Sequence, residues 1–270
     1  MATTVTAIRA PRREWPFDLF AEVSSALDAA GERLGDGDVV VISSKYAAVS
    51  QGRTVTEASV AASAPARALA RRLGMRESLA EAVMRESDEV MGGVAGFAMA
   101  VTGGILAPNA GIDGSNAGEG RIVLYPDGAH ELAEQVRRKA FLRLGARAGV
   151  VLSDSRLMPM RAGTCGVAVA FAGIEAVHDA RGQADLDGRP LAVTMRAVAD
   201  SIATMANHEM GEGPESTPIA IVRGSGARMT SSRGEASDAA VSSAECVYAR
   251  GLAGAGSDAA ELEVAPRLLD

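Results

Sequence analysis

The segment NAGIDGSN, residues 109–116, places oxygen-bearing side chains around two glycines directly after an apolar run. Asp113, Ser115 and Asn116 fall within it. A turn needs only one or two such residues, whereas a site for a metal ion and phosphate groups combines several oxygen ligands. The segment therefore has two interpretations, an ordinary turn or a ligand-binding loop in which Asp113 is the metal-binding candidate.

Two further carboxylates lie where predicted elements end. Asp154 ends the predicted strand AGVVLSD and is followed by Ser155, and Glu212 lies in MGEG after a long predicted helix. Mg²⁺ and Mn²⁺ commonly combine one or two carboxylates with nucleotide phosphates. Asp154 as a cap or turn residue and Glu212 as a solvated loop charge are the alternatives. Sequence spacing alone does not bring the three carboxylates together.

Two segments offer groups for phosphate. The glycines of MGEGPEST, residues 210–217, allow backbone N–H groups to wrap a phosphate. The segment matches neither the P-loop nor the GxGxxG pattern, so it is a weak signal on its own. Lys45, in SSKY after an apolar strand-like run, can bring its ammonium to a phosphate or can face solvent.

Other chemistry-bearing residues each have an ordinary alternative. Arg161 and Arg181 can bind carboxylates or phosphates with two parallel hydrogen bonds, or can form surface ion pairs. Cys165 is either a nucleophile or, as we favour, a small buried residue. The three histidines have no metal-binding spacing, which argues against zinc.

Composition bounds the class of protein. With 270 residues and 47% hydrophobic content, the chain predicts one large domain or two intimately packed subdomains. A net charge of -7 argues against a nucleic-acid partner, although a bridging cation would still let carboxylates bind phosphates. Two cysteines, no signal-like start and no apolar span of roughly 20 residues predict a cytoplasmic protein without a membrane partner.

The hydrophobic pattern predicts an α+β fold with mixed sheets, because strands and helices do not alternate regularly. Predicted helices cover 17–34, two stretches of 62–90 divided near Gly74, 128–145 and about 194–211. Predicted strands cover 39–43, a stretch near 52–58, a hairpin over 97–108, 148–154 and 217–224, while 167–174 is a strand or a packed helix. The Ala/Gly/Ser-rich segment 225–270 follows the predicted domain, 1–224, and either belongs to it or is partly mobile.

Several motifs occur together in one order: DGDVVVIS…GR, MRESDEV, NAGIDGSN, VVLSDS…R.G, RGQADLDGRPLAVT…AVADSIA, MGEG and IVRG. In this order they resemble the coenzyme F420-0:L-glutamate ligase family, over about residues 17–224. The resemblance implies the unusual α+β fold of γ-glutamyl ligases, a homodimer, GTP as co-substrate, Mg²⁺ or Mn²⁺, and K⁺ as an optional further ion. It implies that GTP converts a small-molecule carboxylate acceptor into an acyl phosphate, which the amine of L-glutamate then attacks.

The resemblance also implies residue roles. Asp113, Asp154 and Glu212 would be catalytic, and with Ser155 they would bind the metal. The residues implied at the nucleotide are Ser44, Lys45, Asn116, Met210, Gly211, Gly213 and Thr217, and those implied at the substrate are Arg161 and Arg181.

The chain departs from the family pattern at two places. Val49 stands where the family has a lysine, and Lys45, four residues earlier, replaces it if this segment is helical. Leu157 and Met158 stand where the family has Gly-Arg, which predicts a less cationic pocket. We therefore expect an amide ligase, with F420-0 as one candidate acceptor. A ligase for another acceptor or amine and a non-catalytic nucleotide-binding relative are the alternatives.

Overall fold

The computed structural model describes residues 2–251. The chain divides into two compact units, Met1–Ala239 and Ala240–Asp270. Every element discussed below belongs to the first unit. Its mixture of helices with parallel and antiparallel strands confirms the predicted α+β class.

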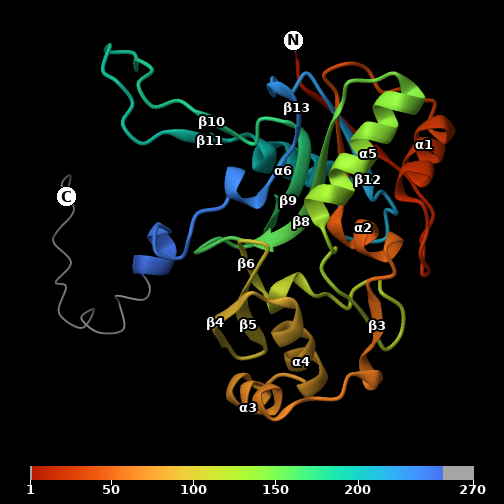
Figure 1. Ribbon diagram of the computed structural model, residues 1–270, viewed down its shortest axis with the longest axis vertical. Coiled ribbons are helices and arrows are strands. Elements are labelled where there is room, and N and C mark those ends of the chain that lie inside the picture. The colour runs from red at the N-terminus through yellow and green to blue at the C-terminus, as the bar shows by residue number, and fades with distance from the viewer. Residues whose placement is uncertain (1, 252–270) are drawn as a thin grey trace. The chain divides into compact units, whose positions relative to one another are not determined.

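A six-stranded sheet forms the centre of the first unit, in the order β1-β12-β2-β8-β9-β13 (Figure 1). Its strands are β1 (Thr4–Ile8), β2 (Val39–Ser43), β8 (Gly149–Leu157), β9 (Thr164–Ile174), β12 (Ile219–Arg223) and β13 (Met229–Arg233). All neighbouring pairs are antiparallel except β2 and β8, which run parallel with Ser43 opposite Ser153. The carboxyl ends of these two strands therefore meet at the same edge.

The central strands are apolar because both of their faces are covered. In β2, Val40 and Ile42 pack on one side of the sheet, and Val39 and Val41 pack on the other. A run of β-branched residues without alternation is typical of such a strand. This explains why VVVIS was recognisable from the sequence.

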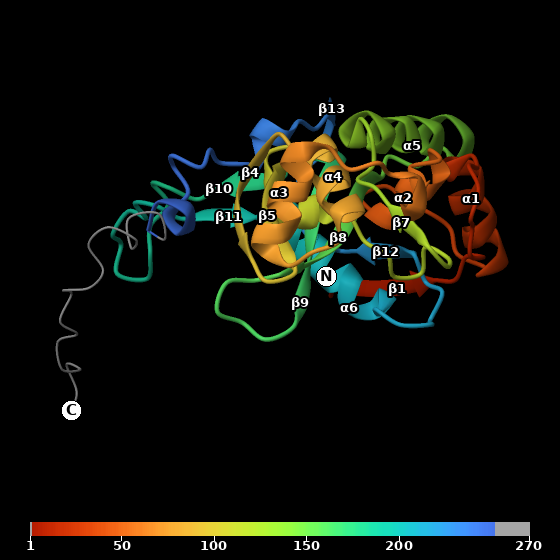
Figure 2. The ribbon, with the colours of Figure 1, turned by 90° about the horizontal axis from the view of Figure 1, so that it is seen from below.

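Helices form the two covering layers. Helices α1 (Leu19–Ala29) and α5 (Ala129–Leu144) contribute to the core on one face of the sheet, and α6 (Val198–Met210) packs on the other. Figure 2 shows α5 and α6 on opposite sides of the sheet. The short helix α2 (Ser44–Ser50) begins directly after β2, so β2 delivers the first turn of α2 to the sheet edge.

A smaller subdomain has a separate core. It contains the sheet β4 (Glu89–Val94), β5 (Phe97–Thr102), β6 (Ile105–Pro108), the helices α3 (Ala64–Leu73) and α4 (Glu77–Glu86), and the pair β3 (Thr54–Thr56) and β7 (Arg121–Val123). The Ser63 side chain caps α3, and Gly74 ends it with the left-handed φ of 61° that glycine adopts readily. Helix α4 packs against the short 3₁₀ turn η2 (Asn109–Gly111), which follows β6.

Several predicted boundaries were wrong. Strand β8 continues to Leu157 instead of ending at Asp154, because β9 pairs with it as far as Leu157–Thr164. Helix α6 begins at Val198 because the preceding residues, Met195–Ala197, form β11, paired with β10 (Val177–Asp179). Sequence patterns also missed β1, β4 and β13, whose short or exposed segments have little hydrophobic periodicity. The expected strand or helix over 167–174 is strand β9.

The compact unit extends past the predicted domain end at 224, since β13 pairs with β9 and the unit reaches Ala239. Within residues 2–251, no helix has both the length and the apolar character required to cross a bilayer. The predicted segment 225–270 lies partly outside the described residues, from 252 onward.

Gly166 in β9 allows α6 to approach the sheet closely. A Cβ at this position would lie 2.3 Å from the carbonyl oxygen of Ala203 and 2.7 Å from Cβ of Asn207, both in α6. We therefore expect Gly166→Ala to lower the free energy of unfolding by about 1–3 kcal/mol through overpacking. Urea denaturation measures the effect.

The matched control is Gly35→Ala, where the nearest atom to the new Cβ would be 3.7 Å away. A Gly166→Ala protein as stable as this control would contradict the close packing of α6 on β9.

Candidate active site

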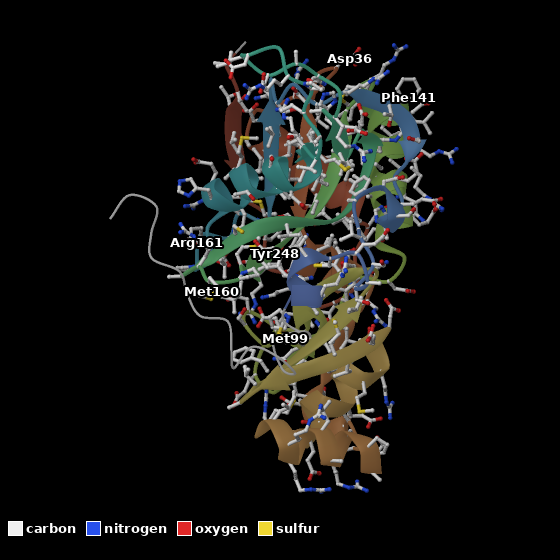
Figure 3. All side chains as sticks on the ribbon, turned by 90° about the vertical axis from the view of Figure 1, so that its left-hand side faces the viewer. Asp36, Met99, Phe141, Met160, Arg161 and Tyr248 are labelled. Carbon is white, nitrogen blue, oxygen red and sulfur yellow. The ribbon has the colours of Figure 1, made fainter. Side chains whose placement is uncertain are left out.

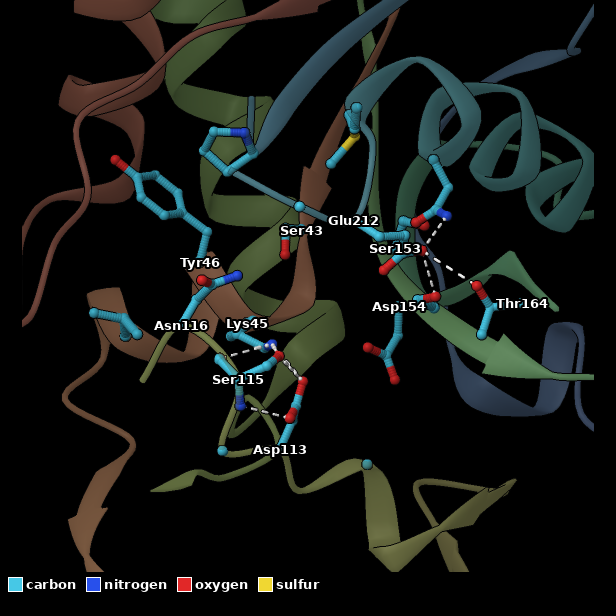
Figure 4. A pocket seen from close by; sticks show the side chains of 18 of the residues that line it. Ser43, Lys45, Tyr46, Asp113, Ser115, Asn116, Ser153, Asp154, Thr164 and Glu212 are labelled. Atoms are coloured by element: carbon cyan, nitrogen blue, oxygen red, sulfur yellow. Dashed lines mark hydrogen bonds and ion pairs between the residues drawn. The ribbon is translucent and has the colours of Figure 1, made fainter. Parts of the chain in front are cut away.

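A pocket of about 750 Å³ opens where the carboxyl ends of β2 and β8 meet (Figure 4). Ser43 and Ser153, the last paired residues of the two parallel strands, both line it. Ligands of α/β proteins commonly bind outside the carboxyl ends of parallel strands, and this volume suits a small-molecule site. The pocket also receives the NAGIDGSN loop, the 210–217 loop and an N-terminal segment, residues 10–13.

The NAGIDGSN loop reaches the pocket through an unusual backbone. Asn109, Ala110 and Gly111 have consecutive positive φ values of 51°, 54° and 72°. This conformation is unfavourable for alanine, and Ala110 is fully buried against the smaller subdomain. The Asn109 side chain accepts a 2.9 Å hydrogen bond from the backbone N–H of Ala98 and holds the turn. Strain maintained by surrounding packing is characteristic of functional sites.

Asp113 forms the first polar group of the pocket with Lys45 and Ser115. Lys45 Nζ pairs with Asp113 Oδ2 and donates to Ser115 Oγ at 2.7 Å. Ser115 donates through both its backbone N–H and its hydroxyl to the Asp113 carboxylate, at 2.7 and 2.6 Å. Partial burial acts to raise the pKa of Asp113, but the hydrogen bonds from Lys45 and Ser115 outweigh it and hold the pKa below its usual value.

Asp154 forms the second group. Its Oδ1 accepts a 3.1 Å hydrogen bond from Ser44 Oγ, and its Oδ2 lies 2.5 Å from Nε of Arg156. Because alternate residues of a strand share a face, Asp154 and Arg156 both point to the side of the sheet that holds Val150 and Leu152.

Glu212 forms the third group on the opposite side of β8. Its Oε1 accepts hydrogen bonds from Ser155 Oγ at 2.5 Å, Asn207 Nδ2 at 2.8 Å and Thr164 Oγ1 at 3.4 Å. Ser155 therefore faces α6, away from its neighbour Asp154. Figure 4 separates the Lys45–Asp113–Ser115 group from the Glu212–Thr164 group in the view, with Asp154 between them.

The three predicted carboxylates thus line one pocket, each with partners of its own. Among residues 2–251, no three His, Cys, Asp or Glu side chains are close enough to hold a metal ion by themselves. Mg²⁺ seldom uses an all-protein cage and instead binds one or two carboxylates together with phosphates and water. The oxygen donors of the pocket fit a cation shared with a nucleotide, and the four-residue shell of Asp113, Asp154, Ser155 and Glu212 stays a prediction.

The 210–217 loop borders the same pocket through Met210, Gly211, Gly213 and Thr217. It is fixed at both ends, since Thr217 Oγ1 donates to the Met210 carbonyl at 2.5 Å and Ser216 Oγ donates to the Ala10 carbonyl at 2.9 Å. Inside the loop, the Gly213 N–H donates to Glu215 Oε2 at 2.7 Å. This amide is therefore occupied by the Glu215 carboxylate, and its binding of a phosphate stays a prediction.

Helix α2 contains Lys45 and Val49, and both residues line the pocket. Lys45 was expected to replace the lysine missing at Val49 only if this segment is helical, and the segment is helical. Asn116 also lines the pocket, with a left-handed φ of 56°. Ser44 is buried and does not line it; its hydroxyl instead holds Asp154.

The two predicted substrate arginines lie elsewhere. Arg161 is exposed in the turn between β8 and β9, where Figure 3 shows it beside Met160 at the outer tip. Arg181 pairs with Asp179 at 2.6 Å near the β10–β11 hairpin. Neither residue lines the pocket, so the surface ion pair is the observed state of Arg181.

Sequence reasoning missed most of the pocket's basic residues. The basic side chains that line it are Arg12, Arg13, Lys45, Arg76 and Arg156, and the acidic ones are Asp113, Asp154, Glu212 and Glu215. A chain with net charge -7 thus gathers slightly more basic than acidic groups here. Met158 is not part of the pocket, whereas Arg156 is, and the expectation of a less cationic pocket than in the family stays a prediction. The pattern VVLSDSR contained the signal, but the predicted strand ended three residues too early, at Asp154 instead of Leu157.

Comparison with known proteins identifies the family. The sequence model described as F420-0:Gamma-glutamyl ligase matches residues 7–224. The chain belongs to the F420-0:γ-glutamyl ligase family. Among similar proteins is the coenzyme F420:L-glutamate ligase of Methanothermobacter thermautotrophicus, 36% identical over 77% of this chain and 82% of its own. Proteins of the same name from Archaeoglobus fulgidus and Halobacterium salinarum are 37% and 38% identical, over 71% and 74% of this chain and 77% and 79% of theirs.

The family match confirms the resemblance drawn from the ordered motifs. It extends from the end of β1 through β12, and therefore covers every segment that lines the pocket. Strand β13 lies beyond the matched residues, so the γ-glutamyl ligase core can be assigned to the part of the chain that builds the site.

The effect of Lys45 on the pKa of Asp113 can be tested. We expect Lys45→Met to raise the pKa of Asp113, because the desolvating effect of burial persists while the largest opposing hydrogen bond is lost. In the unaltered protein the stability that Asp113 contributes is present above its unfolded pKa and is lost as pH falls through its lowered folded pKa. NMR titration of the carboxyl carbon measures the change.

Arg181→Met serves as the matched control. It should raise the pKa of Asp179 from about 2, by removing the hydrogen bond from Arg181 that is the main cause of the low value, and should leave Asp113 unchanged. An unchanged Asp113 pKa in Lys45→Met would disprove the assigned pairing.

Proposed function

We propose that the chain is a GTP- and divalent-metal-dependent amide ligase that joins a carboxylate acceptor, with F420-0 as the first candidate, to L-glutamate. The observation that carries this proposal is the gathering of Asp113, Asp154 and Glu212 around one pocket together with Lys45 and Asn116, in a chain of the γ-glutamyl ligase family. The basic residues of the pocket also suit an anionic nucleotide and acceptor. The proposal includes a homodimer acting in the cytoplasm.

The proposed reaction has two balanced steps. An oxygen of the acceptor carboxylate bonds to the γ-phosphorus of GTP as the bond from that phosphorus to the bridging oxygen breaks, giving GDP and an acyl phosphate. The amine of L-glutamate then bonds to the acyl carbon, the carbon–oxygen bond to phosphate breaks, and the nitrogen loses a proton. Activation is needed because a carboxylate oxygen is a poor leaving group.

The chain's residues act by positioning and by charge. Asp113 and Asp154, with Glu212, would hold Mg²⁺ or Mn²⁺, and K⁺ is an optional further ion. The bound divalent cation would neutralise charge that develops on the transferred phosphoryl group. Lys45 can turn from Asp113 to a phosphate oxygen, since its ammonium has three donors on a flexible stem. Asn116 offers an amide to the nucleotide from the adjoining loop.

A second candidate is a ligase of the same chemistry for another acceptor or amine. The observation in its favour is Leu157, which lines the pocket where the family pattern has glycine. A branched apolar side chain narrows this side of the pocket and would select a differently shaped acceptor.

The deciding experiment combines purified protein with GTP, Mn²⁺, L-glutamate and F420-0, and follows phosphate release and product mass. We expect addition of glutamate to F420-0. Metal-dependent nucleotide binding without this product would favour the second candidate. Absence of metal-dependent nucleotide binding would refute both candidates, and a parallel reaction with ATP tests the choice of nucleotide.

Substitution of Asp154 separates catalysis from folding. We expect Asp154→Asn to lower the rate of phosphate release by about 100-fold or more, since it removes a negative charge from the proposed cation site. The amide oxygen retains an acceptor for Ser44. Steady-state phosphate assays and thermal unfolding measure the two properties.

Asp154→Ala is the informative comparison. Both variants remove the charge that pairs with the buried Arg156, but alanine also removes every acceptor for Arg156 and Ser44, so we expect it to cost more stability than Asp154→Asn, about 3–5 kcal/mol. Wild-type turnover by Asp154→Asn would count against the proposed metal site.

A further inference from the structure

Arg156 is a buried cation whose guanidinium N–H groups have no hydrogen-bond partner among the described residues. Only 5% of the residue is exposed, although it lines the pocket. A guanidinium stays charged in proteins and carries five N–H donors. Burying it is costly unless it is both paired and hydrogen-bonded. Its partners therefore decide what it can do.

The ion pair with Asp154 balances the charge of Arg156 but does not satisfy its N–H donors. Nε lies 2.5 Å from Asp154 Oδ2, yet without the direction of a hydrogen bond. Nη1 and Nη2 also have no hydrogen-bond partner among the described residues. If Arg156 served only to hold Asp154, its donors would be aligned on that carboxylate, as in the two-bond pair of Arg181 with Asp179.

The backbone of Gly111 packs closely against the end of the Arg156 side chain. A Cβ built on Gly111 would lie 3.2 Å from Arg156 Nη2 and 3.1 Å from the Tyr125 ring. Gly111 lines the pocket and, with its φ of 72°, is a position that favours glycine. A side chain at position 111 would press against the guanidinium, so this close approach of the backbone to Arg156 depends on glycine.

A second buried donor lines the same pocket. Ser153 is 3% exposed, and its Oγ has no partner among the described residues. Buried polar groups are normally satisfied, so unsatisfied ones on a pocket wall indicate a ligand.

We propose that Arg156 binds an oxyanion of a substrate through its terminal nitrogens and thereby determines which substrates the pocket accepts. The chemistry is that of two oxygens on one centre, either the carboxylate of the acceptor or the transferred phosphoryl group, because a guanidinium meets both with parallel hydrogen bonds. This inference rests on the proposed ligase function and assigns one of its binding residues. Asp154, directly beside Arg156, keeps the cation balanced when no oxyanion is bound.

The first test observes Arg156 in the unaltered protein. The Nε–H signal of Arg156, assigned by its loss in Arg156→Lys, is followed by NMR during separate titrations with inorganic phosphate, acetate, GTP with Mg²⁺, and F420-0. We expect a saturable shift with at least one of them. No shift with any of the four would overturn the proposal, and this readout does not require turnover.

The second test identifies the source of the oxyanion. Arg156→Lys keeps a cation beside Asp154 but loses the two-bond geometry, and Arg181→Lys is the matched control outside the pocket. Calorimetry measures the affinities for GTP, GDP and F420-0. Hydrogen bonds to charged groups contribute enough that we expect about a 10- to 100-fold loss for the ligand that Arg156 binds.

Weaker GTP binding with unchanged GDP binding would assign Arg156 to the γ-phosphoryl group. Weaker F420-0 binding with both nucleotides unchanged would assign it to the acceptor carboxylate. Affinities within about twofold of the control for all three would overturn the proposal, even if the melting temperature fell.

Failure of the Arg156 proposal can be distinguished from failure of the proposed ligase function. Wild-type glutamate addition with an unaffected Arg156→Lys would refute the role of Arg156 alone. Phosphate or carboxylate binding at Arg156 in a protein that releases no phosphate from GTP would refute the ligase and leave the oxyanion site standing.

Discussion

The parallel pairing of β2 and β8 is the constraint on which the pocket depends. It is the only parallel pair among the strands described in the six-stranded sheet, and it aligns Ser43 with Ser153. Both strands are buried on their two faces, so hydrophobic packing by α1, α5 and α6 fixes their ends. The polar residues that follow then have no freedom to separate: Ser44 and Lys45 enter α2, while Asp154 and Arg156 continue β8.

The smaller subdomain supplies the opposite wall by another means. Its core includes Ala110 and Ile112 from the NAGIDGSN loop, and α4 packs against the turn that begins it. The three left-handed residues are therefore maintained by packing below the pocket and by the hydrogen bond from Ala98 to Asn109. Asp113 can present its carboxylate to Lys45 because the backbone before it is rigid.

Much of this arrangement could be predicted, because the strongest patterns have a direct physical cause. The β-branched run of β2, the helical period of α5 and the glycine between α3 and α4 each identified an element. The ordered motifs identified the family, and the polar loops led to Asp113, Asp154 and Glu212. The pattern failed where pairing decides the structure: β8 extends past Asp154 only because β9 lies beside it. The burial of Arg156 and the displacement of Arg161 and Arg181 from the pocket depend on that geometry, which sequence spacing does not contain.

The extended end of β8 has a consequence for how this pocket can change in evolution. Consecutive residues of the strand point to opposite faces of the sheet. Asp154 and Arg156 pair on one face, and Ser155 contacts Glu212 on the other. A substitution at position 154 or 156 can therefore change the contacts on one face while the contact between Ser155 and Glu212 on the other face is kept. Gain or loss of a single residue at this point would instead exchange the contacts of the two faces at once. Divergence among such proteins should accordingly proceed here by substitution, with the length of the strand held constant.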